Sequence, residues 1–344
     1  MFQTVGHDKA IKTLTRALDD GRVSHAYLFV GPPQVGKMTL AMDLARAVNC
    51  VADEQPNMFG EIEAKPCGTC VQCDRITRAL HIDVRVVTLA EDAKGRTRTL
   101  ISIDQVREVQ RDVSLRPSEG KYRVFIFDGA EYLSLDAANA LLKTLEEPPD
   151  QVILILTATD SDRLLSTISS RCQTFELRPV KQPVIVDLLK SQHGADEETA
   201  EEIARLSEGR IGWAIEAVAD PAILEGIEEK ITTVESIVQG GMEVRFEYAE
   251  NLARTFGRDR DAVRKDLALW LEWWRDMMVV KEGVPRFVKH LARLDTFQTG
   301  AAKVTVKEIA GAVRAAEETM YFLDRNVNAR LAVESMMLAM PRIR

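Results

Sequence analysis

The sequence of 344 residues lacks any apolar run of about 18 residues, the length that a membrane-spanning helix needs. Its N-terminus, MFQTVGHDKAIKTL, is mixed and charged, so it lacks the apolar core of a secretory signal. Internal repeats and low-complexity segments are also missing. We therefore expect a cytoplasmic protein without a membrane partner. The length predicts two or three domains, because a domain typically holds about 100 to 200 residues.

The chain also lacks an excess of basic residues, and its formal net charge is −8. The overall field would repel phosphate groups, so any contact with DNA requires a local basic patch or a larger assembly. Cysteine is scarce, with five residues, but four of them lie close together and Cys172 stands alone. In a reducing cytosol, such a cluster is more often a metal site than a disulfide framework.

Short apolar runs rich in β-branched and aromatic residues alternate with helical patterns in the first half of the chain. Continuous apolar runs are typical of strands that are buried on both faces. Strands separated by helices indicate a parallel α/β sheet. The predicted strands are Tyr27–Val30, Val84–Leu89, Val124–Phe127, Val152–Leu156 and Gln173–Leu177.

The strand patterns end near Pro179, and the rest of the chain has helical patterns. Asp220-Pro221 marks a second boundary. Three short helices are predicted between these points, at Val184–Lys190, Glu197–Leu206 and Ile211–Val218. The boundaries predict three domains: an α/β core at residues 1–178, a small helical domain at 179–220 and a helical domain at 221–344.

The segment Gly31-Pro-Pro-Gln-Val-Gly36-Lys37 lies between the first predicted strand and a helical pattern at Leu40–Ala47. Glycines let backbone N–H groups turn inward around a phosphate, and a helix N-terminus adds positive potential. Lys37 would supply a compact positive charge to the β- and γ-phosphates. An ordinary tight turn is the alternative. The predicted nucleotide-binding residues are Gly31, Pro32, Gln34, Val35, Gly36, Lys37, Met38, Thr39 and Asp128.

The residue after the lysine departs from the usual motif. A Ser or Thr there ligates Mg²⁺, but this chain has Met38, whose soft thioether is a poor ligand for a hard cation. Thr39 is a candidate substitute, although it lies about 100° further around the helix. The loop can therefore fold as a phosphate loop and yet bind nucleotide weakly or not at all.

Asp128 follows the predicted strand Val124–Phe127. This is the position of the aspartate that organises magnesium in phosphate-loop enzymes. A strand-end carboxylate that only caps a nearby N–H group is the alternative.

The sequence Cys67-Gly-Thr-Cys70-Val-Gln-Cys73 contains two consecutive C-x₂-C steps, and Cys50 ends the helical pattern after the phosphate loop. Four thiolates suit a tetrahedral, structural Zn²⁺ without an open position. The irregular, polar stretch Val51–Ala64 cannot bury much apolar surface, so a metal would hold this insert together. Free surface cysteines and a redox C-x-x-C pair are the alternatives. A catalytic zinc is disfavoured because no His or carboxylate joins the set.

Together these motifs resemble one family, the AAA+ subunits of the bacterial DNA polymerase III clamp loader. The matches cover roughly the first half of the chain in family order, and only the whole set is specific. The resemblance implies a P-loop AAA+ core with a parallel sheet and a zinc module at about residues 50–73, a helical lid, and a helical collar that holds a ring of subunits. Besides the loop and the cysteines, the matching stretches are His25-Ala-Tyr-Leu-Phe29, Leu115-Arg-Pro117, Gly120-Lys-Tyr122, Asn139–Pro149 and Ser170-Arg171-Cys172.

The resemblance also implies a role for Arg171, because the family's Ser-Arg-Cys arginine reaches into the ATP site of the adjacent subunit. A delocalised cation there stabilises charge that develops on the transferred phosphoryl group. An intramolecular salt bridge of Arg171 is the alternative. Thr157 and Thr159 lie where the family has its phosphate-sensing residue, and the sequence does not choose between them.

The family's motor subunits, γ/τ, keep the loop hydroxyl and a glutamate directly after the strand-end aspartate, which orients the attacking water. Here those positions are Met38 and Gly129. Glu131 comes two residues later and is expected to face elsewhere. Because both losses affect the same metal–water chemistry, they indicate an inactive catalytic site.

The lid motif departs from the motor pattern as well. In Gly209-Arg-Ile-Gly-Trp-Ala214, Gly212 stands where the motor has a sensing arginine, and Arg210 is displaced. Three altered positions beside a retained Arg171 resemble the δ′ subunit most closely; a γ/τ motor subunit is the alternative within the family.

The helical C-terminal region contains a broad apolar stripe at i, i+3, i+4, i+7 and i+8 spacing. A surface of the collar and an ordinary domain core both account for it. The stripe comprises Trp270, Trp273, Trp274, Met277 and Met278.

We therefore expect a non-motor, δ′-like subunit that helps load the sliding clamp onto primed DNA during replication. Its partners would be the γ/τ and δ subunits, and the clamp and DNA through the complex. Zn²⁺ is the expected structural cofactor, and ATP with Mg²⁺ is doubtful. DNA-directed DNA polymerase (nucleotidyltransferase) activity would belong only to the holoenzyme. The alternatives are an active ATPase motor, with Thr39 or Glu131 replacing the lost groups, and a stand-alone DNA-binding AAA+ module, which the acidic balance disfavours.

Overall fold

The computed structural model describes residues 2–52, 65–91, 97–325 and 327–343. The chain divides into two compact units, residues 1–218 and 219–344. The stretch Val51–Ala64, which we predicted to be irregular, falls almost wholly on residues 53–64 and so lies outside the described residues. Within the described ranges, no helix has the length and apolar character needed to cross a membrane. The division into core, lid and collar stays a prediction.

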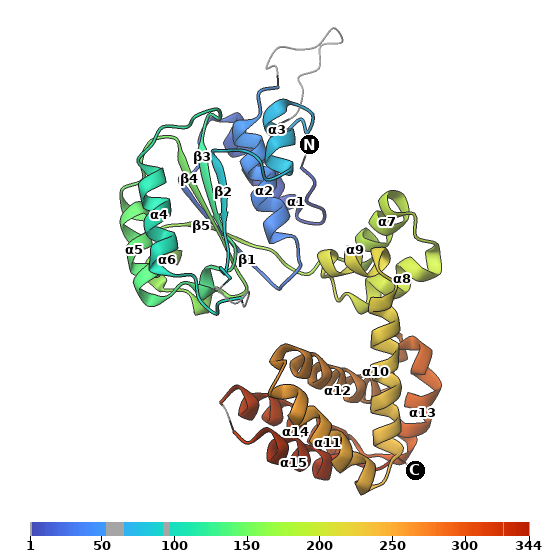
Figure 1. The fold of residues 1–344 in the computed structure, drawn as a ribbon. Coiled ribbons are helices and arrows are strands. Elements are labelled where there is room, and N and C mark those ends of the chain that lie inside the picture. Colours follow the sequence, from blue (N-terminus) through green and yellow to red (C-terminus); the bar gives the residue numbers. More distant parts are fainter. Residues whose placement is uncertain (1, 53–64, 92–96, 326, 344) are drawn as a thin grey trace. The chain divides into compact units, whose positions relative to one another are not determined.

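A five-stranded sheet in the order β2-β3-β4-β1-β5 forms the centre of the first unit (Figure 1). Every strand pair is parallel, which confirms the predicted α/β class. All residues of the three central strands are buried, and this explains why these strands appear in the sequence as continuous apolar runs. The strands are β1 Ala26–Val30, β2 Val84–Val87, β3 Arg123–Phe127, β4 Val152–Ala158 and β5 Gln173–Glu176.

Helices cover both faces of this sheet (Figure 1). Successive side chains of a strand point to opposite faces, so Tyr27 and Phe29 pack in the core that contains α1 and α2. Leu28 and Val30 pack in the core that contains α4 and α5. The helices are α1 Asp8–Asp19, α2 Lys37–Asn49, α3 Val71–Thr77, α4 Ile103–Val113, α5 Leu135–Glu146 and α6 Ser166–Ser169, with 3₁₀ turns η1 Ala130–Tyr132 and η2 Ser161–Arg163.

The first unit also contains three further helices, at the places where the sequence predicted three short helices. The Asp196 side chain caps the second of them by accepting a hydrogen bond from the N–H of Thr199 at 2.9 Å. The three are α7 Gln182–His193, α8 Glu197–Leu206 and α9 Ile211–Ala219.

Among its described residues, the second unit consists of helices joined by turns and has its own apolar core. The tryptophan stripe lies inside this core, because Trp270, Trp273, Trp274 and Met277 are all buried and Met278 packs against them. These side chains are therefore the interior of this unit. The elements are α10 Ala222–Gln239, α11 Met242–Phe256, α12 Arg260–Lys281, η3 Pro285–Phe287, η4 Leu291–Arg293, α13 Leu294–Lys303, α14 Val306–Asp324 and α15 Ala329–Ala339.

Candidate functional site

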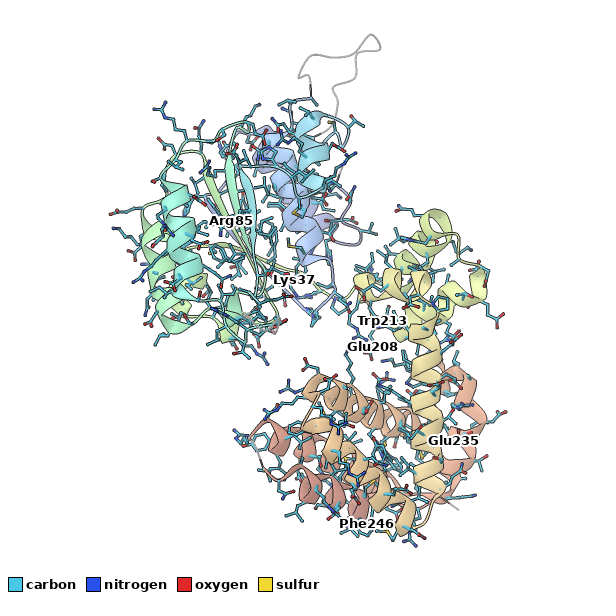
Figure 2. All side chains as sticks on the ribbon, viewed as in Figure 1. Lys37, Arg85, Glu208, Trp213, Glu235 and Phe246 are labelled. Carbon is cyan, nitrogen blue, oxygen red and sulfur yellow. The ribbon has the colours of Figure 1, made fainter. Side chains whose placement is uncertain are left out.

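The phosphate loop connects β1 to α2, with Gly36 as the N-cap and Lys37 as the first helical residue (Figure 2). The Lys37 ammonium turns back over the loop and donates hydrogen bonds to the carbonyl of Gly31 and, at 2.8 Å, to that of Pro32. Burial lowers the pKa of Lys37, while the charges of Glu131 and Asp128 oppose that shift. If a phosphate bound in the loop, the Lys37 ammonium would exchange these carbonyl partners for a negatively charged oxygen.

The N-terminal segment contacts both α2 and the phosphate loop. The buried Asp43 carboxylate accepts hydrogen bonds from the backbone N–H groups of Gln3 and Thr4, at 3.0 and 2.8 Å. A few residues later, His7 Nε2 lies 2.8 Å from the carbonyl oxygen of Val35. The sequence does not predict these contacts, because the segment carries no motif of its own.

A cavity of 620 Å³ opens at the carboxyl ends of the strands, beside the loop. This edge is where ligands bind in open α/β sheets, because the strand ends and helix N-termini converge there. The cavity is lined by Pro33, Gln34, Gly36, Lys37, Met38, Thr39, Thr88, Leu89, Thr97, Asp128, Gly129, Glu131, Tyr132, Thr157, Ala158, Thr159 and Gly212.

Six of the nine residues predicted to bind nucleotide thus line the cavity, Thr39 among them. The other three lie in the loop without lining it. Gly31 and Pro32 offer their carbonyls to Lys37, and Val35 is buried with its carbonyl toward His7.

Asp128 and Thr157 form a linked pair at the ends of β3 and β4. The Thr157 hydroxyl donates to Asp128 Oδ1 at 2.8 Å and accepts from the backbone N–H of Gly129 at 3.0 Å. Thr159 makes a different contact, to Glu131. Both threonines line the cavity, so the cavity lining does not choose between them as phosphate sensor.

Glu131 corrects one expectation, because it lines the cavity instead of facing elsewhere. Its Oε1 accepts hydrogen bonds from the Thr159 hydroxyl at 2.8 Å and from the Thr159 N–H at 3.0 Å. Its Oε2 is buried and has no hydrogen-bond partner among the residues that the structure describes. The reason is the turn η1, which begins directly after Gly129 and returns the chain toward the strand ends.

Gly129 occupies a place where a side chain would be strained. Its φ is +81°, in the left-handed region that residues with a Cβ rarely adopt. A Cβ at this position would also come within 2.6 Å of the Tyr132 ring. The family's glutamate would therefore need both a changed backbone and a displaced tyrosine.

The segment that the sequence predicts to be a lid, residues 179–220, contacts the loop at Gly212. Gly212 lines the cavity, and its N–H donates to the carbonyl of Gln34 at 2.8 Å. Arg210 is engaged elsewhere: its Nε donates to the carbonyl of Ser207 at 2.9 Å, and its guanidinium carbon lies 5.8 Å from the ring centroid of Trp213. Figure 2 labels Trp213 on α9.

Arg171 makes an intramolecular ion pair, the alternative that the sequence left open. Its guanidinium donates to Glu146 on α5 at 2.7 Å and to the carbonyl of Thr167 at 2.9 Å. The two paired side chains are 35% and 50% exposed. Exposed pairs of this kind contribute about 1 kcal/mol or less, so another anion can replace Glu146.

The four clustered cysteines converge around one point. Cys50 caps the C-terminal end of α2, Cys70 caps the N-terminal end of α3, and all four sulfur atoms lie within 4.8 Å of one another. Sulfur atoms about 2.3 Å from a tetrahedral zinc are about 3.8 Å apart. The pairs Cys50–Cys70 and Cys67–Cys73 are each 4.0 Å apart. The residues therefore fit a four-thiolate metal site.

The protonation of these thiols is uneven. Burial raises the pKa of Cys50 and of Cys73. Burial acts in the same direction on Cys67, but hydrogen bonds from the N–H groups of Cys70 and Thr69 outweigh it and lower its pKa to about 6. Four thiolates at this spacing repel one another, so a divalent cation is needed to hold all four ionised.

The buried carboxylate of Asp83 holds the loop at residues 118–120, which contacts α3, the cysteine helix. Asp83 accepts hydrogen bonds from the backbone N–H groups of Ser118, Glu119 and Gly120, at 2.8 to 2.9 Å. The carbonyl of Glu119 in turn accepts from the side chain of Gln72, on α3, at 2.8 Å. The cysteine cluster thus has protein contacts beneath it besides any metal.

The parallel sheet, the phosphate loop after β1 and the aspartate after β3 define a P-loop AAA+ fold. Residues 6–181 match the family described as "DNA polymerase III, delta subunit", and the chain belongs to this family. It is similar to DNA polymerase III subunit tau of Escherichia coli (strain K12), at 34% identity over 244 residues, covering 70% of this chain and 35% of tau. Subunit tau of Bacillus subtilis (strain 168) is 36% identical over 198 residues, covering 58% and 32%.

A third relative, subunit gamma of Buchnera aphidicola subsp. Acyrthosiphon pisum (strain APS), is 32% identical over 216 residues, covering 61% of this chain and 55% of gamma. The chain spans about a third of the length of the two tau relatives. Among solved structures, a gamma subunit-related protein of Thermotoga maritima is 17% identical, with 97% of this chain and 99% of that chain covered and a TM-score of 0.42. A RuvB mutant of the same organism is 18% identical, with 67% and 65% covered and a TM-score of 0.41.

Proposed function

We propose that this chain is a non-motor, δ′-like subunit of the bacterial DNA polymerase III clamp loader. In this role it helps the ATP-dependent loading of a sliding clamp onto primed DNA, together with γ/τ and δ subunits. Membership of the family and the similarity to tau and gamma subunits support a place in that complex. Residues 1–178, 179–220 and 221–344 would serve as core, lid and collar.

The observation that carries the non-motor assignment is the composition of the cavity. Met38 occupies the place of the magnesium-binding hydroxyl, and Gly129 occupies the place of the water-orienting glutamate. The conformation of Gly129 and its closeness to Tyr132 leave little room for that glutamate. Lys37 and the helix N-terminus would still attract phosphate, so a cradle remains without its metal chemistry.

Arg171 would act at the ATP site of the neighbouring subunit. Its ion pair with Glu146 is exposed and weak, so the guanidinium is available to a stronger anion. A phosphoryl group in transfer carries more negative charge than a carboxylate, which makes it the better partner.

The four cysteines, Cys50, Cys67, Cys70 and Cys73, would hold a structural zinc. The sulfur spacing supports this assignment. Such a metal would join the end of α2 to the start of α3 and would take no part in hydrolysis.

A second candidate is an active motor subunit of the same complex, and two observations favour it. The relatives at the highest identities above are tau and gamma subunits. In addition, Thr39 and Glu131 line the cavity, where they could replace the lost hydroxyl and glutamate. Against this, Glu131 is bound to Thr159 through two hydrogen bonds, and Thr39 follows the expected position by one residue.

A steady-state ATPase assay separates the two candidates. The purified chain is incubated with ATP, Mg²⁺ and primed DNA, beside its Lys37→Ala variant. We expect equal, background-level turnover from both, because the metal-binding and water-orienting groups are missing. Clear turnover that Lys37→Ala abolishes would establish the motor subunit instead.

A further inference from the structure

The first turn of α9, in the predicted lid, contacts the phosphate loop directly. Gly212 is the second residue of α9, so its N–H is one of the first-turn groups that lack a partner within the helix. Here the carbonyl of Gln34, in the phosphate loop, accepts from it at 2.8 Å. The loop itself thus satisfies one of the open N–H groups at the start of α9.

A second hydrogen bond joins the same two elements. The side-chain amide of Gln34 donates to Glu216 Oε2 at 2.8 Å, one turn further along α9. Gln34 adopts a φ of 59°, in the left-handed region that non-glycine residues seldom occupy. The loop residue that takes this unusual conformation is therefore the one whose carbonyl and side chain both contact α9.

The close approach depends on the missing side chain at position 212. A Cβ there would lie 3.1 Å from the carbonyl oxygen of Gln34 and 3.2 Å from its Cβ. Ile211 is also close to the loop: a Cβ added to Gly36 would lie 3.8 Å from Cγ2 of Ile211. The first turn of α9 is consequently seated on the loop at two neighbouring points.

We propose that these contacts form a latch, made of Gly212, Gln34 and Glu216, that holds the lid on the phosphate loop whether or not the cavity is occupied. Where a charged residue at this lid position could contact a phosphate, this chain has a backbone N–H that contacts the loop. At this position the lid therefore binds the phosphate loop instead of the ligand. The inference rests on the proposed function only in treating the cavity as a nucleotide site.

The latch can be measured in the full chain without any nucleotide. Glycine-selective ¹⁵N labelling gives a spectrum of 19 glycines, and the Gly212 signal is the one that Gly212→Ala removes. We expect the Gly212 amide to exchange its hydrogen far more slowly than an unstructured peptide. Glu216→Ala should speed this exchange roughly two- to fivefold, because it removes an exposed charged acceptor, whereas Glu216→Gln keeps an acceptor and should change it less. Exchange at the unstructured rate in the free protein would overturn the latch.

A matched pair of helix substitutions tests the close approach. Gly226 lies within α10, and a Cβ there would meet nothing within 4 Å. Gly212→Ala should shift the Gly36 signal, while Gly226→Ala should leave it in place. An unmoved Gly36 signal in both variants contradicts the proposed packing. If Gly212→Ala does not fold, sequential assignment identifies the Gly212 signal, and the Glu216 variants still decide.

The outcome is independent of whether ATP binds. If the chain binds no ATP, the cradle assigned under the proposed function fails, but a protected Gly212 amide in the free protein still supports the latch. If ATP binds and the Gly212 amide is protected only in its presence, the latch fails and the cradle stands.

Discussion

The two ends of α2 carry the two motifs of the first unit, and they differ in completeness. At its start, the phosphate loop has its lysine and its helix N-terminus but has Met38 in place of a hydroxyl. At its end, Cys50 joins three other cysteines whose spacing suits one metal ion. Four candidate metal ligands thus gather at one end of α2, whereas the loop at the other end departs from the usual motif at Met38.

The difference between the two ends of α2 shows that a sequence motif can be present without all the groups that its chemistry needs. A four-thiolate site needs only four sulfur atoms at the right spacing. A hydrolytic site needs a cradle, a metal ligand and a water-orienting group together. The loop at the start of α2 has the lysine and the helix N-terminus of a cradle, so its presence alone does not establish hydrolysis.

The largest expected effect follows removal of a cysteine ligand. The chain should bind about one zinc per molecule. Cys73→Ser should reduce this to none and lower the melting temperature, because the polar sequence of the insert offers little apolar surface to bury. Elemental analysis and a thermal melt measure both results. Cys172→Ser, outside the cluster, is the control and should retain the metal. A wild-type chain that is fully folded and metal-free after purification with zinc would refute the assignment.

An intermediate effect is expected at Asp83, which tests how far protein contacts alone support the cysteine helix. Burial opposes the charged form of Asp83, but hydrogen bonds from the N–H groups of Glu119, Gly120 and Ser118 outweigh it and lower its pKa. Asp83→Asn should cost about 3 kcal/mol of unfolding free energy at neutral pH. Denaturant unfolding gives this value.

The sign of the pH dependence follows from the lowered pKa of Asp83. The charged carboxylate stabilises the folded state above the pKa of the unfolded chain, about 3.9, and that stability is lost as pH falls through the lower, folded pKa. The difference between wild type and Asp83→Asn should therefore shrink below about pH 4. Asp104→Asn, at a site that is 82% exposed, should behave like wild type. A difference that stays constant into acid would exclude the carboxylate as its source.

The smallest effect on this chain's own stability is expected at Arg171. Arg171→Ala should cost no more than about 1 kcal/mol, because the pair with Glu146 is exposed. In a reconstituted loader, the same change should slow ATP hydrolysis at the neighbouring site by at least about tenfold, since a charge that stabilises the transferred phosphoryl group is gone. Glu146→Ala removes the same ion pair but keeps the cation, and should leave hydrolysis intact. Unchanged turnover with Arg171→Ala would exclude the role in trans.

The sheet and the location of the cavity could be predicted from the sequence for a physical reason. Fully buried parallel strands produce uninterrupted apolar runs, and the end of each run marks the edge where a ligand would bind. Thus Asp128, at the end of β3, and the loop after β1 fall on one cavity. The cysteine cluster could also be predicted from the sequence, because three of its four cysteines lie within seven residues.

The contacts that the sequence did not predict depend on local turns and on distant partners. Glu131 lines the cavity because a left-handed Gly129 starts a 3₁₀ turn, which simple alternation along the chain does not foresee. The sequence allowed an ion pair of Arg171 but did not identify its partner Glu146, which is 25 residues away. His7 supports the loop at Val35 from a segment without a recognisable motif.

An equilibrium titration of ATP, in excess Mg²⁺ and again in a chelator, tests the central claim most directly. The claim is that the loop retains its phosphate cradle and has lost its metal chemistry, since Met38 is a poor ligand for Mg²⁺. We expect ATP to bind with nearly the same affinity in both conditions, and Lys37→Ala to weaken binding in both. ATP binding that appears only with Mg²⁺ would contradict the claim.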